Sequence, residues 1–182
     1  MSIDRRARAT RYRISEAFLR LGGMRAIDAI RVDDLAREAG IARSTFYAHF
    51  TGLDDYMARG FAAMLENFAA RGSAGMILPV GAIVDHVGEV GEGAQRMARH
   101  RHFPAMLSEG ERALRRVAEA RLTLREPHLD PIERASIATM LAAGFLALLR
   151  DWMEDPRGRS AGEISKRFEK LETRLVGSTA VG

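Results

Sequence analysis

Cysteine is absent from this chain of 182 residues. Its absence excludes disulfide bonds, thiolate metal sites and cysteine nucleophiles, and it suits a cytoplasmic protein. The sequence has no uninterrupted run of about 18 apolar residues, so we expect no membrane-spanning helix and no membrane partner. The N-terminal arginines are not followed by the apolar stretch of a signal peptide. We therefore expect a cytoplasmic location.

Motifs for catalysis and for metal binding are also missing. His100 and His102 would lie on different faces of a helix, and the sequence contains no His-x-x-x-His pair. No glycine-rich phosphate loop, dinucleotide fingerprint or nucleophile motif is present. The sequence therefore predicts neither an enzyme nor a metal site, and no cofactor.

Lysine is scarce, and nearly all the positive charge comes from arginine. Residues 1–25 hold seven arginines against Asp4 and Glu16, a local balance of +5. A basic segment of this kind is typical of proteins that bind a polyanion, with nucleic acid ahead of an anionic membrane. A second basic stretch covers residues 96–125, and for that stretch we favour a solvated surface.

The spacing of apolar residues predicts an all-α protein, because no segment shows the sustained alternation of a strand. We expect helices at 5–22, 33–39, 43–49, 53–71, 82–100, 111–125, 131–154 and 160–176. Gly22-Gly23 is expected to end the first helix and Asp33 to cap the second. Thr51 and Asp54 have the spacing of a capping box for the fourth.

A tight helical pair lies within "LAREAGIARSTFYAHF", from Leu35 to Phe50. A helix of seven residues is marginal by itself, so packing must hold both members. Gly40 permits the turn between them. The inward residues are expected to be Val32, Leu35, Ala36, Ala39, Ile41, Phe46 and Phe50. This leaves on the outward side Arg43, Ser44, Thr45, Tyr47 and His49.

The outward residues have the chemistry of a DNA groove contact. Arginine can donate two hydrogen bonds to guanine, and serine and threonine can bond base edges or phosphates. Tyrosine and histidine can reach phosphate oxygens. Arg43 to Thr45 would occupy the N-terminal positions of a recognition helix, which meet base edges. Similar helical hairpins occur in proteins that bind no DNA, so the spacing alone leaves both interpretations open.

The segment "RVDDLAREAGIARSTFYAHFTGLDDYM" resembles the N-terminal domain of the TetR family of bacterial transcriptional regulators. The match extends back through "TRYRISEAFLRLGGMRAIDAI" and covers roughly residues 10–60. The pattern A-x-x-A-G followed by S-T-F-Y-x-H-F is highly specific. The resemblance implies a three-helix helix-turn-helix DNA-binding domain, followed by a C-terminal helical domain for ligand binding and dimerisation.

The resemblance also implies roles for individual residues. Base or phosphate contacts are implied for Arg43, Ser44 and Thr45, phosphate contacts for Tyr47 and His49, and backbone contacts for Thr10 and Arg11. Members of the family often carry a lysine after the second phenylalanine, where this chain reads "TGLDD". We expect domains at 1–52 and 72–182, joined by helix 53–71.

The C-terminal domain contains the chain's most apolar helix, 131–154. One apolar stripe consists of Ile137, Leu141, Phe145, Leu148 and Trp152, and a second of Ala135, Ala138, Ala142, Leu146 and Leu149. Two stripes suggest burial against both the same chain and a partner. The predicted dimer interface therefore combines the second stripe with Phe168, Leu171 and Leu175. The alternative is a helix buried centrally within one chain.

Methionine and phenylalanine suit an adaptable apolar pocket for a small-molecule effector. The candidate lining residues are Met64, Phe68, Met97, Phe103, Met106, Met140 and Phe145. Ordinary core packing is the alternative for each of them.

The expected function is a ligand-responsive transcriptional regulator, a repressor in the first instance. It would bind double-stranded DNA at a near-palindromic operator as a homodimer, and a small molecule would release it. The first alternative is a protein–protein interaction module or co-regulator that keeps the fold without binding an operator, which the missing lysine would favour. A small-molecule carrier or an enzyme is the third interpretation.

Overall fold

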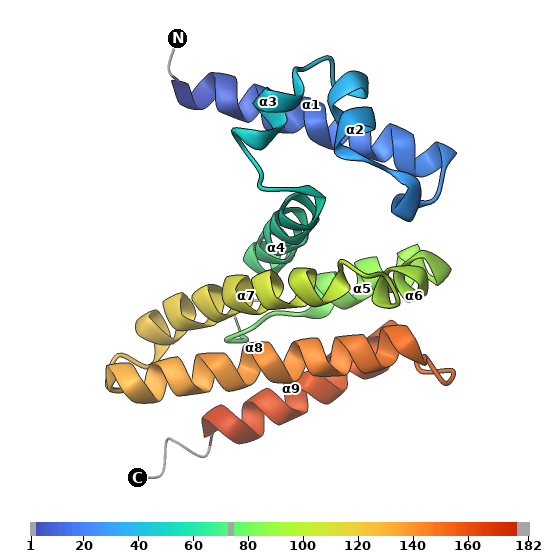
Figure 1. Ribbon diagram of the computed structural model, residues 1–182. Helices are drawn as coiled ribbons and strands as arrows, with labels where there is room; N and C mark the ends of the chain where they lie inside the picture. Colours follow the sequence, from blue (N-terminus) through green and yellow to red (C-terminus); the bar gives the residue numbers. More distant parts are fainter. Residues whose placement is uncertain (1–2, 73–74, 178–182) are drawn as a thin grey trace. The chain divides into compact units, whose positions relative to one another are not determined.

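The computed structural model describes residues 3–72 and 75–177, and the chain divides into two compact units, Met1–Met57 and Ala58–Gly182. Within those described ranges every regular element is a helix, which confirms the all-α fold class (Figure 1). The first unit contains α1 (Ile3–Met24), the 3-10 turn η1 (Ile27–Ala29), α2 (Val32–Glu38) and α3 (Arg43–Tyr47). Helix α4 (Leu53–Arg71) begins in the first unit and ends in the second. The remaining helices are α5 (Gly81–Val90), α6 (Glu92–Ala98), α7 (Phe103–Arg125), α8 (Pro131–Glu154) and α9 (Ala161–Gly177).

Apolar side chains from all the helices of the first unit meet in its core. Helix α1 supplies Ile14 and Ala17, which are both fully buried. Phe46 of α3 is also fully buried, and its ring centroid lies 5.4 Å from that of Phe50. The Phe50 ring lies 5.2 Å from the ring of Tyr56 at the start of α4. Tertiary burial therefore stabilises α2 and α3, which are too short to be stable alone.

Helix α1 extends past the two glycines that were expected to end it. It ends at Met24, and the N–H of Arg25 still donates to the carbonyl of Leu21 at 3.0 Å. Gly22 and Gly23 have open space on their side-chain side. A glycine in a helix costs about 1 kcal/mol relative to alanine. Burial of the apolar stripe of α1, which includes Leu21, outweighs that cost.

Helix α2 begins before the residue that was expected to cap it. Its first residue is Val32, so Asp33 lies in the first turn and does not cap the helix. The carboxylate of Asp34 accepts a hydrogen bond from the backbone N–H of Arg31 at 3.2 Å. Asp33 is thereby left available for contacts outside its own helix.

Three of the seven N-terminal arginines bind α2. Arg13 donates from Nε and from a terminal nitrogen to the carbonyl of Ala39, at 3.0 and 2.8 Å, and also to the carbonyl of Gly40. Arg20 and Arg25 form ion pairs with acidic side chains of α2 at 2.6 and 3.1 Å. Among the other N-terminal arginines, Arg5, Arg6 and Arg11 are exposed on α1.

The region expected as one helix from 82 to 100 is divided into α5 and α6. Gly91 adopts a φ of +55° between them, a conformation that other residues rarely adopt. Helix α7 begins at Phe103, earlier than the expected residue 111. Pro104 lies in its first turn, where the missing N–H of proline costs nothing.

Helix α8 is the central helix of the second unit, between α7 and α9 (Figure 1). Side chains of both predicted apolar stripes are buried there, including Ile137, Leu141, Phe145, Ala138, Ala142 and Leu149. By length and composition alone α8 could cross a membrane, since its most apolar 18-residue window has a mean hydropathy of 1.6. Packing of both stripes within the helical bundle accounts for that composition.

The basic stretch at 96–125 stabilises the second unit. The side chain of Arg116 pairs with Glu66 of α4 at 2.7 Å. Arg121 donates to the carbonyls of Ala69 and Met76, both at 3.1 Å. These contacts hold α7 against α4 and against the segment after α4. The arginines of the basic stretch that make them therefore have a structural role that needs no polyanion.

A buried carboxylate on α9 fixes the segment before α5. Glu172 is 4% exposed, and its two oxygens accept the backbone N–H groups of Ile77 at 2.6 Å and Leu78 at 2.9 Å. Burial raises the pKa of Glu172, and the two N–H donors and the Arg125 charge offset that rise only in part. Glu172 therefore joins two segments that are far apart in the sequence.

We expect Glu172→Ala to destabilise the second unit by roughly 2–4 kcal/mol, because two buried N–H groups lose their acceptors. Denaturant unfolding of the full chain, followed by fluorescence of its single tryptophan, Trp152, measures the change. Lys170→Ala, an exposed change on the same helix, should alter stability by less than about 0.5 kcal/mol. Equal stability of the two variants would contradict the anchoring role of Glu172.

The raised pKa of Glu172 predicts a pH dependence of stability. The folded chain holds this proton more tightly than the unfolded chain, so the wild type loses stability as pH rises through the raised pKa. Glutamine cannot titrate. The stability of Glu172→Gln relative to the wild type should therefore increase between about pH 4 and pH 7. The opposite trend would show that the N–H donors outweigh burial.

Candidate nucleic-acid interface

Helix α3 is positioned by its turn and by one buried side chain. Gly40 adopts a φ of +61° in the turn after α2, and the N–H of Ile41 donates to the carbonyl of Ala36 at 3.0 Å. Phe46 inserts into the core, which fixes the rotation of α3 about its own axis. The helix ends at Tyr47, two residues before the predicted end. Its remaining side chains are directed away from the core.

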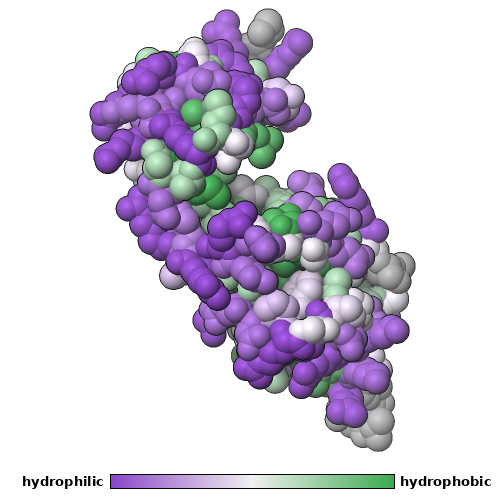
Figure 2. All heavy atoms as spheres, turned by 90° about the vertical axis from the view of Figure 1, so that its right-hand side faces the viewer, coloured by the Kyte–Doolittle hydropathy of each residue, from purple (hydrophilic) through white to green (hydrophobic). Residues whose placement is uncertain are grey.

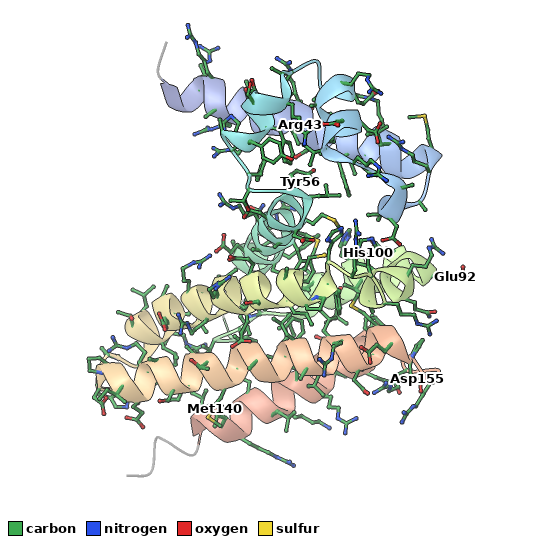
Figure 3. All side chains as sticks on the ribbon, viewed as in Figure 1. Arg43, Tyr56, Glu92, His100, Met140 and Asp155 are labelled. Atoms are coloured by element: carbon green, nitrogen blue, oxygen red, sulfur yellow. The ribbon has the colours of Figure 1, made fainter. Side chains whose placement is uncertain are left out.

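The five residues predicted to face outward differ in exposure. Arg43, Ser44 and Tyr47 are exposed on α3, whereas Thr45 is half-buried in the same helix. His49 is half-buried just beyond the helix, with its ring 6.3 Å from that of Phe50. The exposed Arg43, Ser44 and Tyr47 therefore share one surface of the helix, which we call the α3 face. Figure 3 shows where Arg43 lies on it.

The N-terminal half of α1 supplies a second group of predicted contacts. Arg11 is exposed and Thr10 is half-buried on this helix. The exposed Arg5, Arg6 and Arg8 precede them. The predicted backbone contacts and these three arginines therefore share one helix. Polar side chains also cover much of the molecular face in Figure 2.

The guanidinium of Arg43 has two neighbours within the first unit. One terminal nitrogen lies 3.0 Å from a carboxylate oxygen of Asp33, which lies on α2. The other terminal nitrogen donates to the hydroxyl of Tyr47 at 3.5 Å, and the guanidinium carbon lies 5.5 Å from the centre of that ring. The hydrogen bond to Tyr47 and the charge of Asp33 raise the pKa of Arg43. Arg43 therefore stays positively charged on the α3 face.

The segment that lacks the expected lysine has an acidic residue with a structural role. The N–H of Thr51 donates to the carboxylate of Asp55 at 2.9 Å, one residue after the Asp54 of the predicted capping box. Asp55 thereby stabilises the N-terminus of α4. The negative charge in "TGLDD" is explained by this helix start.

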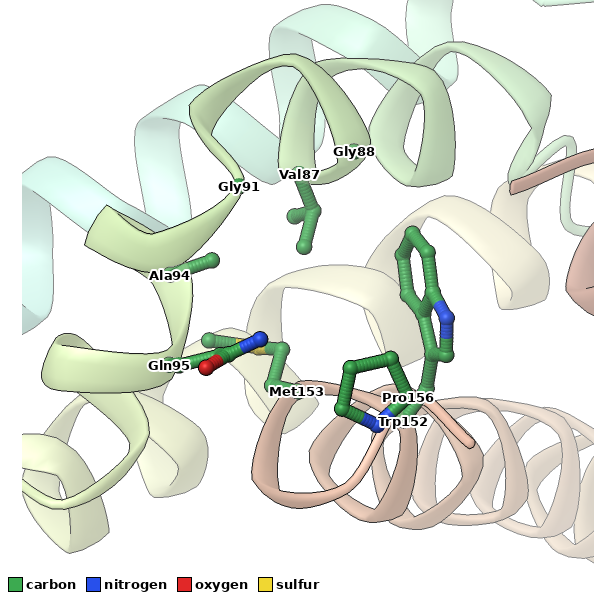
Figure 4. Close-up of a pocket in the computed structure, with 8 residues that line it drawn as sticks. All are labelled: Val87, Gly88, Gly91, Ala94, Gln95, Trp152, Met153 and Pro156. Atoms are coloured by element: carbon green, nitrogen blue, oxygen red, sulfur yellow. The ribbon is translucent and has the colours of Figure 1, made fainter. Parts of the chain in front are cut away.

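The residues predicted to line an effector pocket differ in burial. Phe103, Met106 and Phe145 are buried in the core of the second unit, whereas Met140 is 57% exposed. The half-buried members are Met64, Phe68 and Met97. A cavity of about 150 Å³ lies elsewhere, lined by Val87, Gly88, Gly91, Ala94, Gln95, Trp152, Met153 and Pro156 (Figure 4).

Most of the predicted dimer residues are buried inside the second unit. Ala138, Ala142 and Leu149 have no exposed surface, and Leu146 and Phe168 are nearly as buried. Contacts within the second unit account for their burial, and their place in a dimer interface stays a prediction. The predicted residues that keep some exposure are Ala135, Leu171 and Leu175.

An apolar groove of about 430 Å³ lies on the surface between α8 and α9. Its lining includes Met140, Gly144, Ala147, Leu148, Leu171 and Leu175. We call this surface the α8–α9 groove, and it contains the exposed Met140 seen in Figure 3. The groove combines Leu148 of the first predicted stripe with residues 140, 144 and 147 of α8, which belong to neither stripe.

Comparisons with known proteins agree with this geometry. Residues 14–55 match the family described as "Bacterial regulatory proteins, tetR family". The fold is similar to that of the dihydroxyacetone kinase operon activator DhaS, with a TM-score of 0.59 and 18% identity over 93% of this chain and 95% of that one. It is also similar to FadR of Thermus thermophilus, a TetR-family transcriptional repressor solved with lauroyl-CoA, with a TM-score of 0.54 and 19% identity over 91% and 93% of the two chains. A search of curated proteins found no match.

The matched residues contain the turn at Gly40, the buried Phe46 and the α3 face. They extend from the core stripe of α1 to the start of α4. The two solved structures share the helical arrangement over most of their length. The N-terminal domain of the chain, residues 14–55, therefore matches that of the tetR family of bacterial regulatory proteins, and the whole chain shares its helical fold with the two solved structures.

Proposed function

We propose that the protein is a ligand-responsive repressor that binds a near-palindromic operator as a homodimer in the cytoplasm. The observation that carries the proposal is the α3 face, where a buried Phe46 directs polar side chains outward within the family match. The proposed base or phosphate contacts are Arg43, Ser44 and Thr45. Tyr47 and His49 would contact phosphates.

The arrangement suits the major groove. Arg43 and Ser44 are the first two residues of α3, and residues at the start of a recognition helix meet base edges. Thr10 and Arg11 would contact the DNA backbone from α1. The exposed arginines that precede them would add attraction to phosphates that does not depend on sequence.

A second copy of the chain is the proposed occupant of the α8–α9 groove. The groove is apolar, and its floor continues the buried face of α8. Two copies related by a two-fold axis would form a four-helix bundle from α8 and α9 of each chain. Such a dimer would present two α3 helices to half-sites about 34–36 Å apart.

Regulation by a small molecule is proposed from the fold. The FadR structure was solved with lauroyl-CoA, so the shared helical arrangement can accommodate a ligand in that protein. In this chain an effector that changes the separation of the two α3 helices would shift the dimer between two geometries. DhaS is an operon activator, so the fold does not distinguish activation from repression. Repression is therefore a separate part of the proposal for this chain.

A second candidate function is a protein–protein interaction module or co-regulator without operator binding of its own. The absence of lysine from "TGLDD" favours it, because the segment carries two aspartates where a phosphate contact is common in the family. The DNA titration described next separates the two candidates.

Replacement of Arg43 tests the proposed contact with DNA bases. The full chain is titrated against its own upstream intergenic DNA and against random duplex, at two salt concentrations. We expect tight binding to the upstream DNA only, and Arg43→Ala should weaken it by about 10- to 100-fold while relaxing the preference at one base position. Arg37→Ala, on α2 with a side chain 79% exposed, is the control that removes an equal charge.

Two results would contradict this prediction. Weak binding that is equal on both duplexes and depends steeply on salt would reflect phosphate attraction alone, and it would favour the interaction module. If Arg43→Ala and Arg37→Ala lowered affinity equally on every sequence, Arg43 would have no base contact.

Replacement of a residue in the α8–α9 groove tests the proposed dimer. Leu171, which is 46% exposed in the α8–α9 groove, is replaced by glutamate. Burying two charged groups across the two-fold axis should weaken self-association by at least about 100-fold. Sedimentation equilibrium measures the change. Leu124→Glu, at a site 82% exposed on α7 and outside the groove, should dimerise like the wild type. Equal association of both variants would exclude the groove as the interface.

A further inference from the structure

The Arg43 side chain is held although it is exposed. Its terminal nitrogen Nη1 lies 3.0 and 3.3 Å from the two carboxylate oxygens of Asp33. Its other terminal nitrogen, Nη2, donates to the hydroxyl of Tyr47 at 3.5 Å. The three side chains come from the first turn of α2 and from both ends of α3. The contact with Asp33 therefore links the two helices on the α3 face.

These contacts leave enough donors for a base. A guanidinium has five N–H groups, and Asp33 and Tyr47 each engage one terminal nitrogen. The Nε–H and one N–H on each terminal nitrogen remain. Two parallel N–H groups suffice for the O6 and N7 atoms of guanine. Arg43 can therefore contact guanine while it keeps its contact with Asp33.

The same contacts disfavour binding to an arbitrary phosphate. To follow the DNA backbone, Arg43 would have to leave Asp33, which would place an uncompensated carboxylate beside a polyanion. An arginine that stays beside Asp33 also has less rotamer freedom to lose on binding. Both effects reduce binding to random DNA more than binding to a site with guanine in register.

We propose that Asp33 is a specificity-determining positioning residue, which holds Arg43 toward a guanine edge and lowers its affinity for phosphates at other sequences. The inference rests on the proposed DNA-binding function. It assigns a role to an acidic residue of α2, which lies outside the set of predicted contacts. Asp33 would change the difference in affinity between DNA sequences, by lowering the affinity for sequences without a guanine in register.

The test compares sequence selection by the full-length wild type and Asp33→Asn from a library of random duplexes. We expect the wild type to select a motif, and the variant to lose at least about fivefold of its preference for one guanine in each half-site. Binding of the variant to a random duplex should become tighter, with a salt slope steeper by about 0.9 per released arginine. Asp33→Glu should restore most of the preference.

Glu38→Gln is the matched control. It removes the same charge from the same helix and breaks an arginine pair at 2.6 Å, but its partner is Arg20 of α1 and not a residue of α3. If Asp33→Asn and Glu38→Gln changed selection equally, net charge alone would be responsible and the proposal would be overturned. Thermal unfolding of each variant confirms that both are folded before selection.

A readout without DNA separates this proposal from the proposed function. The Nε–Hε signal of Arg43 is followed by NMR relaxation in the free wild type, where restricted motion is expected, and in Asp33→Asn, where the side chain should move freely. Restricted motion in both would overturn the proposal whatever the DNA result. If the wild type selected no motif, the proposed function would fail, and the role of Asp33 in specificity with it. A wild-type motif retained by Asp33→Asn would overturn the role of Asp33 alone.

Discussion

Burial of Phe46 is the contact on which the α3 face depends. A helix of five residues has almost no stability of its own. The buried side chain of Phe46 therefore fixes the position of α3. The ring of Phe46 packs against the rings of Phe50 and Tyr56, with centroid distances of 5.4 and 6.5 Å. Once that ring is fixed, the geometry of one helical turn decides that Arg43, Ser44 and Tyr47 are directed outward.

The polar contacts around this anchor divide the arginines by role. Arg13 holds the carbonyls at the end of α2, and Arg20 and Arg25 pair with its acidic side chains. These contacts hold α2 to α1. Basic residues that look alike in the sequence therefore differ in role, because these three have structural partners within the first unit.

The second unit has a larger core, built around α8. Most side chains of both apolar stripes of α8 are buried in it, and the α8–α9 groove remains as an apolar surface. Glu172 joins α9 to the segment before α5 through two backbone N–H groups. The fold of the chain is similar to that of an operon activator and to that of a transcriptional repressor, at under 20% identity to each.

The sequence by itself determined the all-α class, the limits of α4 and α8, and the outward direction of Arg43, Ser44 and Tyr47. Helical periodicity and the prolines and glycines between helices are local signals, and the motif around Gly40 was specific enough to indicate the family. Tertiary structure decided that both apolar stripes of α8 are buried and that the side with Met140, Gly144 and Ala147 stays exposed, because periodicity within one helix does not show how many of its sides other helices will cover. The same holds for Glu172 with Ile77 and Leu78, for Arg13 with Ala39, and for Asp33 with Arg43. Each of these contacts joins residues from different elements, and periodicity within one element carries no information about which partner another element will bring to it.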